Sequence, residues 1–187
     1  IANYAFQDCI SLQTIVISSS VKEIKYAAFQ RCTALQSITI PDNVNVISMF
    51  AFESCSALQT VILSNSLPEI GIRLFYSCTS LQSVTIGESV TYIREAAFYD
   101  TALSSVTIPD SVTTIDDDAF ENTNLSLVLM NPVVKDNLSL EFGENQTFYG
   151  KDNVTIANRE TYVEPVILPV RVADEGENLI GISADGY

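Results

Sequence analysis

Four cysteines are the residues of this chain best suited to chemistry, and they recur at one position of a regular spacing. They stand 23 residues apart, and threonine fills the position in the next two units: Cys9, Cys32, Cys55, Cys78, Thr101 and Thr123. This spacing matches no zinc motif, and the chain has no histidine to complete one. Equivalent side chains one unit apart point the same way, which disfavours disulfide geometry. We interpret the cysteines as buried small residues that threonine can replace, with a disulfide between neighbouring units as the alternative.

Acidic clusters are the second feature with chemical potential. The run Asp116–Asp118 offers carboxylates for Ca²⁺, but it lacks the EF-hand spacing, and consecutive acids on a turn point in different directions. A solvated charge run is the alternative. The segment 174–178, "DEGEN", is typical of a hairpin tip and leaves the same two alternatives. Phosphate-loop, nucleophile-elbow and zinc-protease motifs are absent, and nothing singles out a carboxylate pair. We expect a chain that is not an enzyme and needs no cofactor or metal.

The charge balance excludes several kinds of partner. The formal net charge of the 187 residues is −14, and the part before residue 131 and the part after it are both acidic. A basic stripe that would neutralise phosphates is absent, so we expect no nucleic-acid partner. Because apolar runs stay well below the roughly 18 residues of a membrane span, we also expect no membrane insertion.

Residues 1–130 consist of a sequence repeat with a period of 22 or 23 residues. The phenylalanine column of the repeat consists of Phe6, Phe29, Phe52, Phe75, Phe98 and Phe120. A leucine column runs beside it at Leu12, Leu35, Leu58, Leu81, Leu103 and Leu125. The phenylalanine steps are 23 residues except the last, which is 22, and the last two leucine steps are also 22. The shortening begins with a one-residue deletion in the loop of the fifth unit. Such a period indicates a solenoid, in which each column contacts itself one coil away and the units together bury one continuous core.

The pattern within each unit predicts its local structure. The segment L-x-x-I-x-I alternates with period two and predicts a strand, which must be parallel to its equivalents in the next coils. The segment S-V-x-x-I predicts a second short strand on the opposite wall. The segment around A-F is too short for a full helix and predicts one helical or 3₁₀ turn. A small polar column should turn inward and hydrogen-bond the backbone. Its members are Ser20, Asn43, Ser66, Ser89 and Ser111.

The full unit, I-x-x-x-A-F-x-x-C-x-x-L-x-x-I-x-I-P-x-x-V, resembles the BspA-type leucine-rich repeats of bacterial and protozoan surface proteins. The resemblance covers about residues 1–130, with five nearly complete units and a degenerate sixth. It implies a mainly β leucine-rich-repeat solenoid in a secreted or cell-surface protein, with an extracellular location and a role in binding other proteins, often as an adhesin. The resemblance names no ligand and supplies no catalytic residues.

The outward positions of the predicted parallel strands form the candidate binding face. They are small, β-branched and uncharged: Thr14, Val16, Ser37, Thr39, Thr60, Ile62, Ser83, Thr85, Ser105 and Thr107. Strand alternation extends this outward set by one residue per coil, at Ser18, Pro41, Ser64, Gly87 and Pro109. Solenoid sheets serve as extended binding surfaces, but serine and threonine also simply suit exposed strand positions. The face lacks the Trp, Tyr and Arg anchors common at interface hot spots.

Residues 131–187 lose the period and predict either a β-rich module that is incomplete within this sequence or a smaller β-rich cap. The runs "LSLEF", "NVTIA", "YVEPVILPVRVA" and "LIGIS" predict strands separated by Asn, Gly and Pro turns. From residue 164 on, the sequence loosely resembles strands of bacterial immunoglobulin-like modules, and that resemblance extends to the whole segment. The N-x-[S/T] sequons at Asn124, Asn137, Asn145 and Asn153 would mark surface loops in a eukaryotic secretory pathway.

Taken together, the sequence predicts a non-enzymatic protein-binding or adhesion module that contacts an unknown protein or surface ligand through its parallel-sheet face. The alternative is a structural subunit that self-assembles by stacking uncapped solenoid ends. A minor alternative is ice binding, because rows of threonine on a flat β-solenoid are the layout of ice-binding surfaces. The middle row, however, mixes valine, isoleucine and threonine.

Overall fold

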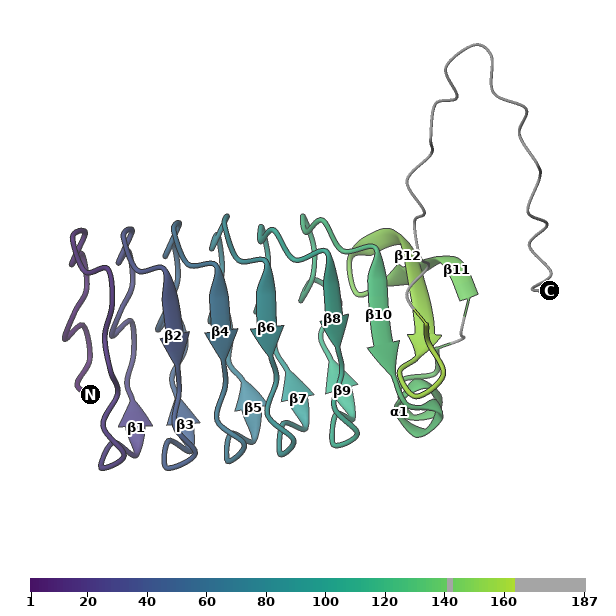
Figure 1. Cartoon of the computed structure of the whole chain (residues 1–187), viewed down its shortest axis with the longest axis horizontal. Helices are drawn as coiled ribbons and strands as arrows, with labels where there is room; N and C mark the ends of the chain where they lie inside the picture. Colours follow the sequence, from purple (N-terminus) through teal and green to yellow (C-terminus); the bar gives the residue numbers. More distant parts are fainter. Residues whose placement is uncertain (141–142, 164–187) are drawn as a thin grey trace, which may run out of the picture.

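The computed structural model describes residues 1–140 and 143–163. In this part of the chain, successive coils lie side by side along one axis, with the N-terminus at one end of the stack (Figure 1). Most coils contribute one short strand to each of two walls. This arrangement confirms the predicted mainly β, parallel-sheet solenoid with its repeat of 23 residues.

The first wall, here called the strand wall, carries the predicted L-x-x-I-x-I strands. Its strands are β2 (Ser37–Thr39), β4 (Thr60–Ile62), β6 (Ser83–Thr85), β8 (Ser105–Thr107) and β10 (Leu127–Met130). They pair in parallel, so that Ile38 stands opposite Val61 and Val61 opposite Val84. The pairing is interrupted between β6 and β8, where the repeat shortens to 22 residues, and resumes between β8 and β10. In the first coil, the predicted strand over residues 14–17 is not formed, and Gln36 N–H donates to Gln13 C=O at 3.2 Å.

The second wall, called the opposite wall, carries the predicted S-V-x-x-I strands. They are β1 (Glu23–Ile24), β3 (Val46–Ile47), β5 (Glu69–Ile70), β7 (Tyr92–Ile93) and β9 (Thr114–Ile115). Each is two residues long, and β1 pairs with β3, β5 with β7 and β7 with β9, all in parallel. The prediction of a second short strand per coil is therefore confirmed.

The core between the walls is built from self-contacting columns, as the repeat predicted. The rings of Phe29 and Phe52 lie 5.2 Å apart and almost parallel, with 3° between their planes. Neighbouring pairs along the column keep centroid distances of 5.0 to 5.6 Å. From Phe29 to Phe120 these rings are completely buried. Because every coil repeats the same shape, the equivalent rings of neighbouring coils stack on one another.

The A-F segments form hydrogen-bonded turns, which refines the prediction of helical turns. Phe29 N–H donates to Ala51 C=O of the next coil at 2.8 Å, whereas the following Gln30 N–H donates within its own coil to Ala27 C=O at 3.2 Å. Donors thus alternate between the neighbouring coil and the local turn. Ala27 and Arg31 have φ of 50° and 60°, and this recurrence of the left-handed region prevents a continuous helix.

The predicted inward polar column is wrong at four of its five positions. Ser111 Oγ donates to Val90 C=O at 2.6 Å as expected, but the other four predicted residues are exposed. In the third coil, the inward hydrogen bond is made by Ser64, two residues before the predicted Ser66. The buried Ser64 hydroxyl donates to Val44 C=O at 2.6 Å. The chain turns toward the core sooner than a simple alternation suggests.

The described residues after β10 pack against the end of the solenoid. They form α1 (Pro132–Asn137), β11 (Gly143–Phe148) and β12 (Lys151–Asn158). β12 pairs in parallel with β10 and antiparallel with β11, so the strand wall gains further strands beyond the last repeat. Phe148 is buried with its ring 5.3 Å from that of Phe120, and it extends the phenylalanine column.

The tail predictions have mixed outcomes. The run "NVTIA" lies in β12, which confirms that strand, whereas α1 and β11 were not predicted. Residues 138–140 of the run "LSLEF" are not a strand. The last predicted strands, the hairpin tip at 174–178 and most of the immunoglobulin-like segment lie outside the described residues. The division of the chain at residue 130 stays a prediction.

Candidate binding face and other candidate sites

All ten predicted face residues on the strand wall are exposed. Val16 is 93% exposed and Ile62 is 44% exposed, while their inward neighbours on the paired strands are mostly buried. Parallel pairing places Thr60 beside Ser83 and Ile62 beside Thr85, so the face is an ordered grid of small side chains about 5 Å apart. The structure thus brings these residues together on one surface, although their orientation alone does not test binding.

The further outward set, one residue per coil, is mostly wrong. Ser64, Gly87 and Pro109 are buried and Pro41 is half-buried, so only Ser18 is exposed as expected. The strands end just before Ile40 and its equivalents, and from there two successive residues enter the turn toward the core. Gly87 shows how tight this turn is, since an added Cβ would lie 2.1 Å from Ser64 C=O.

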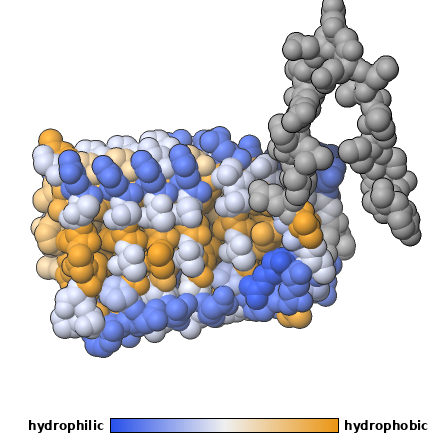
Figure 2. All heavy atoms as spheres, viewed as in Figure 1, coloured by the Kyte–Doolittle hydropathy of each residue, from blue (hydrophilic) through white to orange (hydrophobic). Residues whose placement is uncertain are grey.

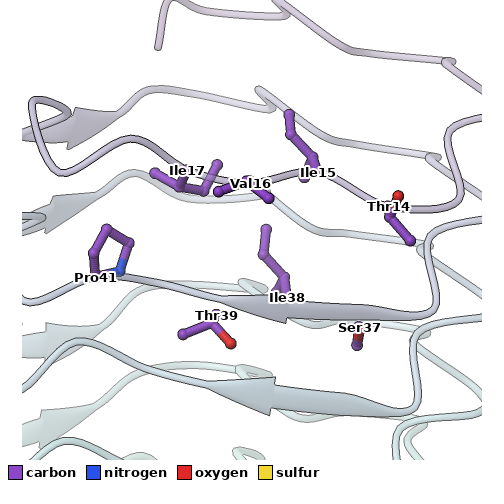
Figure 3. Close-up of a pocket in the computed structure, with 8 residues that line it drawn as sticks. All are labelled: Thr14, Ile15, Val16, Ile17, Ser37, Ile38, Thr39 and Pro41. Atoms are coloured by element: carbon purple, nitrogen blue, oxygen red, sulfur yellow. The ribbon is translucent and has the colours of Figure 1, made fainter.

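A shallow hollow opens on the strand wall between the first coil and β2 (Figure 3). It has a volume of about 270 Å³ and is lined by Thr14–Ile17 of the first coil together with Ser37, Thr39 and Pro41. The space exists because residues 14–17 do not form a paired strand with β2. On the face shown in Figure 2, a hydrophobic band runs along the solenoid between hydrophilic rows. The strand wall therefore offers shape and apolar surface rather than reactive groups.

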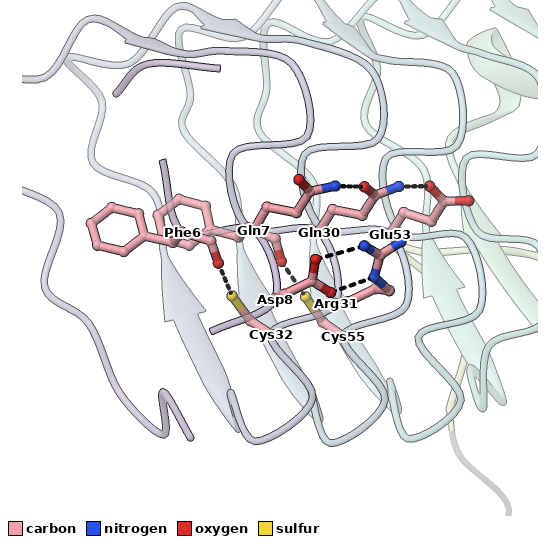
Figure 4. Close-up of polar contacts among 9 residues, drawn as sticks. Phe6, Gln7, Asp8, Gln30, Arg31, Cys32, Glu53 and Cys55 are labelled. Atoms are coloured by element: carbon pink, nitrogen blue, oxygen red, sulfur yellow. Dashed lines mark hydrogen bonds and ion pairs between the residues drawn. The ribbon is translucent and has the colours of Figure 1, made fainter. Parts of the chain in front are cut away.

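The cysteines form hydrogen bonds between coils. All four are free thiols; Cys32, Cys55 and Cys78 are buried, and Cys9 is half-buried. The Cys32 thiol donates to Phe6 C=O at 3.0 Å (Figure 4), and Cys55 repeats the contact one coil on. Burial raises the pKa of the Cys32 thiol to about 12. The interpretation of the column as buried small residues is confirmed for the inner three, and the structure does not form the alternative disulfide.

The three consecutive aspartates are directed to different partners. Asp116 accepts a hydrogen bond from the Tyr92 hydroxyl at 2.7 Å, Asp118 accepts one from Ala96 N–H at 3.1 Å, and Asp117 is exposed. Within residues 1–140 and 143–163, no cluster of three Cys, Asp or Glu side chains could hold a metal ion. The structure therefore does not bring these carboxylates together as calcium ligands.

Sequence reasoning missed a group of exposed and half-buried apolar side chains on the coil edge next to the opposite wall. We call it the wall patch: Tyr4, Tyr26, Met49, Phe50 and Ile72. Tyr26 packs edge-on between Tyr4 and Phe50, with 5.4 Å between ring centroids in each pair. Tyr4 is 52% exposed and Met49 is 41% exposed. The available signal was that Tyr26, Met49 and Ile72 share an apolar column of the repeat that none of the core columns includes.

Polar side chains on the turn side also stack from coil to coil. Arg31 and Asp8 form a two-pronged ion pair, whose hydrogen bonds lower the pKa of the Asp8 carboxyl (Figure 4). Gln30 accepts from Gln7 at 2.6 Å and donates to Glu53. In the part of the chain that the structure describes, no helix is long and apolar enough to cross a bilayer, and α1 has only six residues.

Comparison with solved structures places this fold among bacterial leucine-rich-repeat proteins. A leucine-rich repeat protein from Bacteroides ovatus is 36% identical, with a TM-score of 0.56 over 59% of this chain and 30% of that chain. A leucine-rich cell surface protein from Faecalibacterium prausnitzii is 29% identical, with a TM-score of 0.51 over 66% of this chain and 41% of that one. A leucine-rich repeat protein from T. pallidum is 31% identical, with a TM-score of 0.56 over 58% of this chain and 52% of that one.

The chain therefore spans between 30% and 52% of the length of these three structures. No curated protein matches it. The family model of the BspA type leucine-rich repeat region matches residues 1–126 with six copies. Because this match covers well over half of the sequence and agrees with the observed coils, the chain belongs to the BspA-type leucine-rich repeat family.

Proposed function

We propose that this chain is a non-enzymatic protein-binding or adhesion module of a secreted or cell-surface bacterial protein, and that it binds through the strand wall. The regular grid of exposed, uncharged side chains on a backbone fixed by parallel pairing carries this proposal. Such a surface is already ordered before binding, so little side-chain entropy is lost on contact with a flat or extended partner. The F. prausnitzii structure, whose name describes a cell surface protein, supports the location.

End-to-end stacking is the weaker alternative. At the C-terminal end of the repeats, β12 and β11 cover the edge of β10, so a stacked neighbour would meet β11 instead of a repeat. β11 pairs with β12 through an irregular register, which makes it a poor template for a further strand.

The test measures binding with a charge placed in the middle of the strand wall. The chain is first screened against an array of extracellular proteins, and each hit is measured by surface plasmon resonance. Thr60→Arg and Thr85→Arg should weaken binding at least tenfold, because both residues are exposed on neighbouring strands. Thr113→Arg is the matched control, since Thr113 is also exposed but lies just before β9 on the opposite wall. Full binding by both strand-wall variants would contradict the proposal.

A further inference from the structure

The opposite wall differs in charge between its two ends. The charged residues of this wall, from the first coil to the fifth, are Lys22, Glu23, Lys25, Glu69, Arg73, Arg94, Glu95, Asp116, Asp117 and Asp118. The first coil therefore carries one net positive charge, the third and fourth are neutral, and the fifth carries three negative charges. This polarity stands out because residues 1–130 are acidic as a whole.

In the middle of the wall the charges balance one another, and apolar side chains are exposed beside them. Arg94 pairs with Glu69 at 2.6 Å and lies over the Tyr92 ring, 4.1 Å from its centroid. This pair borders a hollow of about 340 Å³, whose apolar lining includes Met49 and Ile72. Both belong to the wall patch. The wall is thus positive at one end, neutral with exposed apolar side chains in its centre, and negative at the other end.

The outermost charges at the two ends are available to a partner. Lys25 has a half-exposed side chain 3.8 Å from Glu23, an exposed pairing that contributes little. Asp117 is exposed, and the hydrogen bonds from the Tyr92 hydroxyl and the Ala96 backbone go to its neighbours Asp116 and Asp118. Lys25 and Asp117 lie four coils apart, which corresponds to about 20 Å at the spacing of paired strands.

We propose that two copies of this chain associate through their opposite walls in an antiparallel arrangement, with a two-fold axis near the third coil. In such an interface every contact occurs twice. Lys25 of each copy lies over Asp117 of the other, and the apolar centres around Ile72 face each other. A surface with opposite charges at its ends and an apolar centre is complementary to itself in this orientation only. A parallel arrangement would place like charges together.

The dimensions of the wall predict a weak dimer. Five coils span about 25 Å, and a strip of five to six residues is about 20 Å wide, so each copy buries on the order of 500 Å². This area is below the roughly 800 Å² per partner of a standard interface and falls in the range of weak complexes. We therefore expect association that depends on concentration in the micromolar range, and that weakens with added salt.

Sedimentation velocity of the 187-residue chain across a concentration series tests the proposal. The wild type should shift from 20.5 kDa toward twice that mass as its concentration rises. Met49→Lys should keep the chain monomeric, because it places a charge in the apolar centre. Val16→Lys is the matched control on the strand wall and should dimerise like the wild type. A wild type that stays monomeric up to about 1 mM, or a Met49→Lys chain that still dimerises, would overturn the proposal.

A charge exchange tests the antiparallel orientation. Lys25→Glu alone should impair the dimer, because the new glutamate of each copy would face Asp117 of the other. Asp117→Lys alone should also impair it, because the new lysine of each copy would face Lys25 of the other. An equimolar mixture of the two variants should dimerise again, since both contacts of the mixed dimer become Glu against Lys or Lys against Asp. Recovery also demonstrates that both variants are folded. If the mixture does not dimerise although both variants have native circular dichroism spectra, the antiparallel arrangement is overturned. Both tests measure self-association through the opposite wall, so their outcome is independent of the proposed binding through the strand wall.

Discussion

The strand wall and the opposite wall arise from the same repeat, yet they differ in how much their exposed residues change from coil to coil. Along the strand wall, exposed positions such as Thr60 and Thr85 stay small and uncharged. On the opposite wall, one exposed column passes from Tyr26 through Met49 to Asp117. These side chains are exposed, so core packing does not dictate their identity. A uniform wall suits a partner that can bind at any coil, whereas a graded wall suits a partner with one fixed orientation.

Behind both walls, the interior columns hardly vary, for a physical reason. A buried residue in a solenoid packs against its own equivalents in the coils before and after it. A change in one coil therefore disturbs two interfaces at once. This comparison of inside with outside predicts large effects for interior substitutions and small effects for substitutions on either wall.

The largest effect is expected from Phe52→Ala. The Phe52 ring is completely buried between Phe29 and Phe75, at centroid distances of 5.2 and 5.6 Å. Its removal leaves a cavity in two interfaces and should lower the free energy of unfolding by about 3–5 kcal/mol. Urea denaturation followed by circular dichroism measures the change, with Val16→Ala on the strand wall as the exposed control. A loss of less than about 1 kcal/mol would show that the ring column is not the core.

A pair of buried glycines tests how closely neighbouring coils approach each other. In Gly87→Ala the new methyl would lie 2.1 Å from the Ser64 carbonyl oxygen, which forces the backbones of two coils apart. The expected loss of stability is about 1–3 kcal/mol, as for overpacked cores. In Gly71→Ala the methyl meets its nearest atom at 3.5 Å, an ordinary contact, so stability should change by about 0.5 kcal/mol or less. Equal melting temperatures of the two variants would contradict the tight turn at Gly87.

The sequence predicted features that repetition makes unavoidable and missed those that depend on a single local turn. The Phe52 column and the strand alternation around Val61 were predictable, because the period forces each column to contact itself. The burial of Ser64 was not predictable, because alternation stops where the chain turns inward, and no sequence pattern marks that point. The candidate face followed directly from alternation. The wall patch around Tyr26 did not, since its position in the turn depends on left-handed residues such as Ala27.

An intermediate, pH-dependent effect is expected from the cysteine column. Burial raises the pKa of Cys32 to about 12 and that of Cys78 well above its usual range, whereas unfolded thiols titrate near about 8.5. Between these values the folded chain keeps protons that the unfolded chain loses. The stabilisation is therefore complete below about pH 8.5 and is lost as the pH rises toward 12.

Denaturation midpoints at about pH 7.5 and pH 10.5 measure this loss, because the two values lie on either side of the unfolded thiol pKa. Cys32→Thr introduces the residue that the fifth and sixth units carry in this column, so it should fold and lose less stability at the higher pH. If wild type and variant lose the same stability on going to alkaline pH, the buried thiol is not the source.

The smallest effect concerns the strand wall itself. Thr60→Arg should change the free energy of unfolding by about 0.5 kcal/mol or less, because the side chain is exposed and contacts no core column. The long arginine stem can lie along the neighbouring apolar surface of Ile62 while its charge stays in water. Urea denaturation of the variant therefore decides whether this wall is free of folding constraints. If stability fell by about 2 kcal/mol or more, the small uncharged side chains would be required by the ladder and not by a partner. In that case the uniformity of the strand wall would no longer support a binding role, and the graded opposite wall would be the better candidate for recognition.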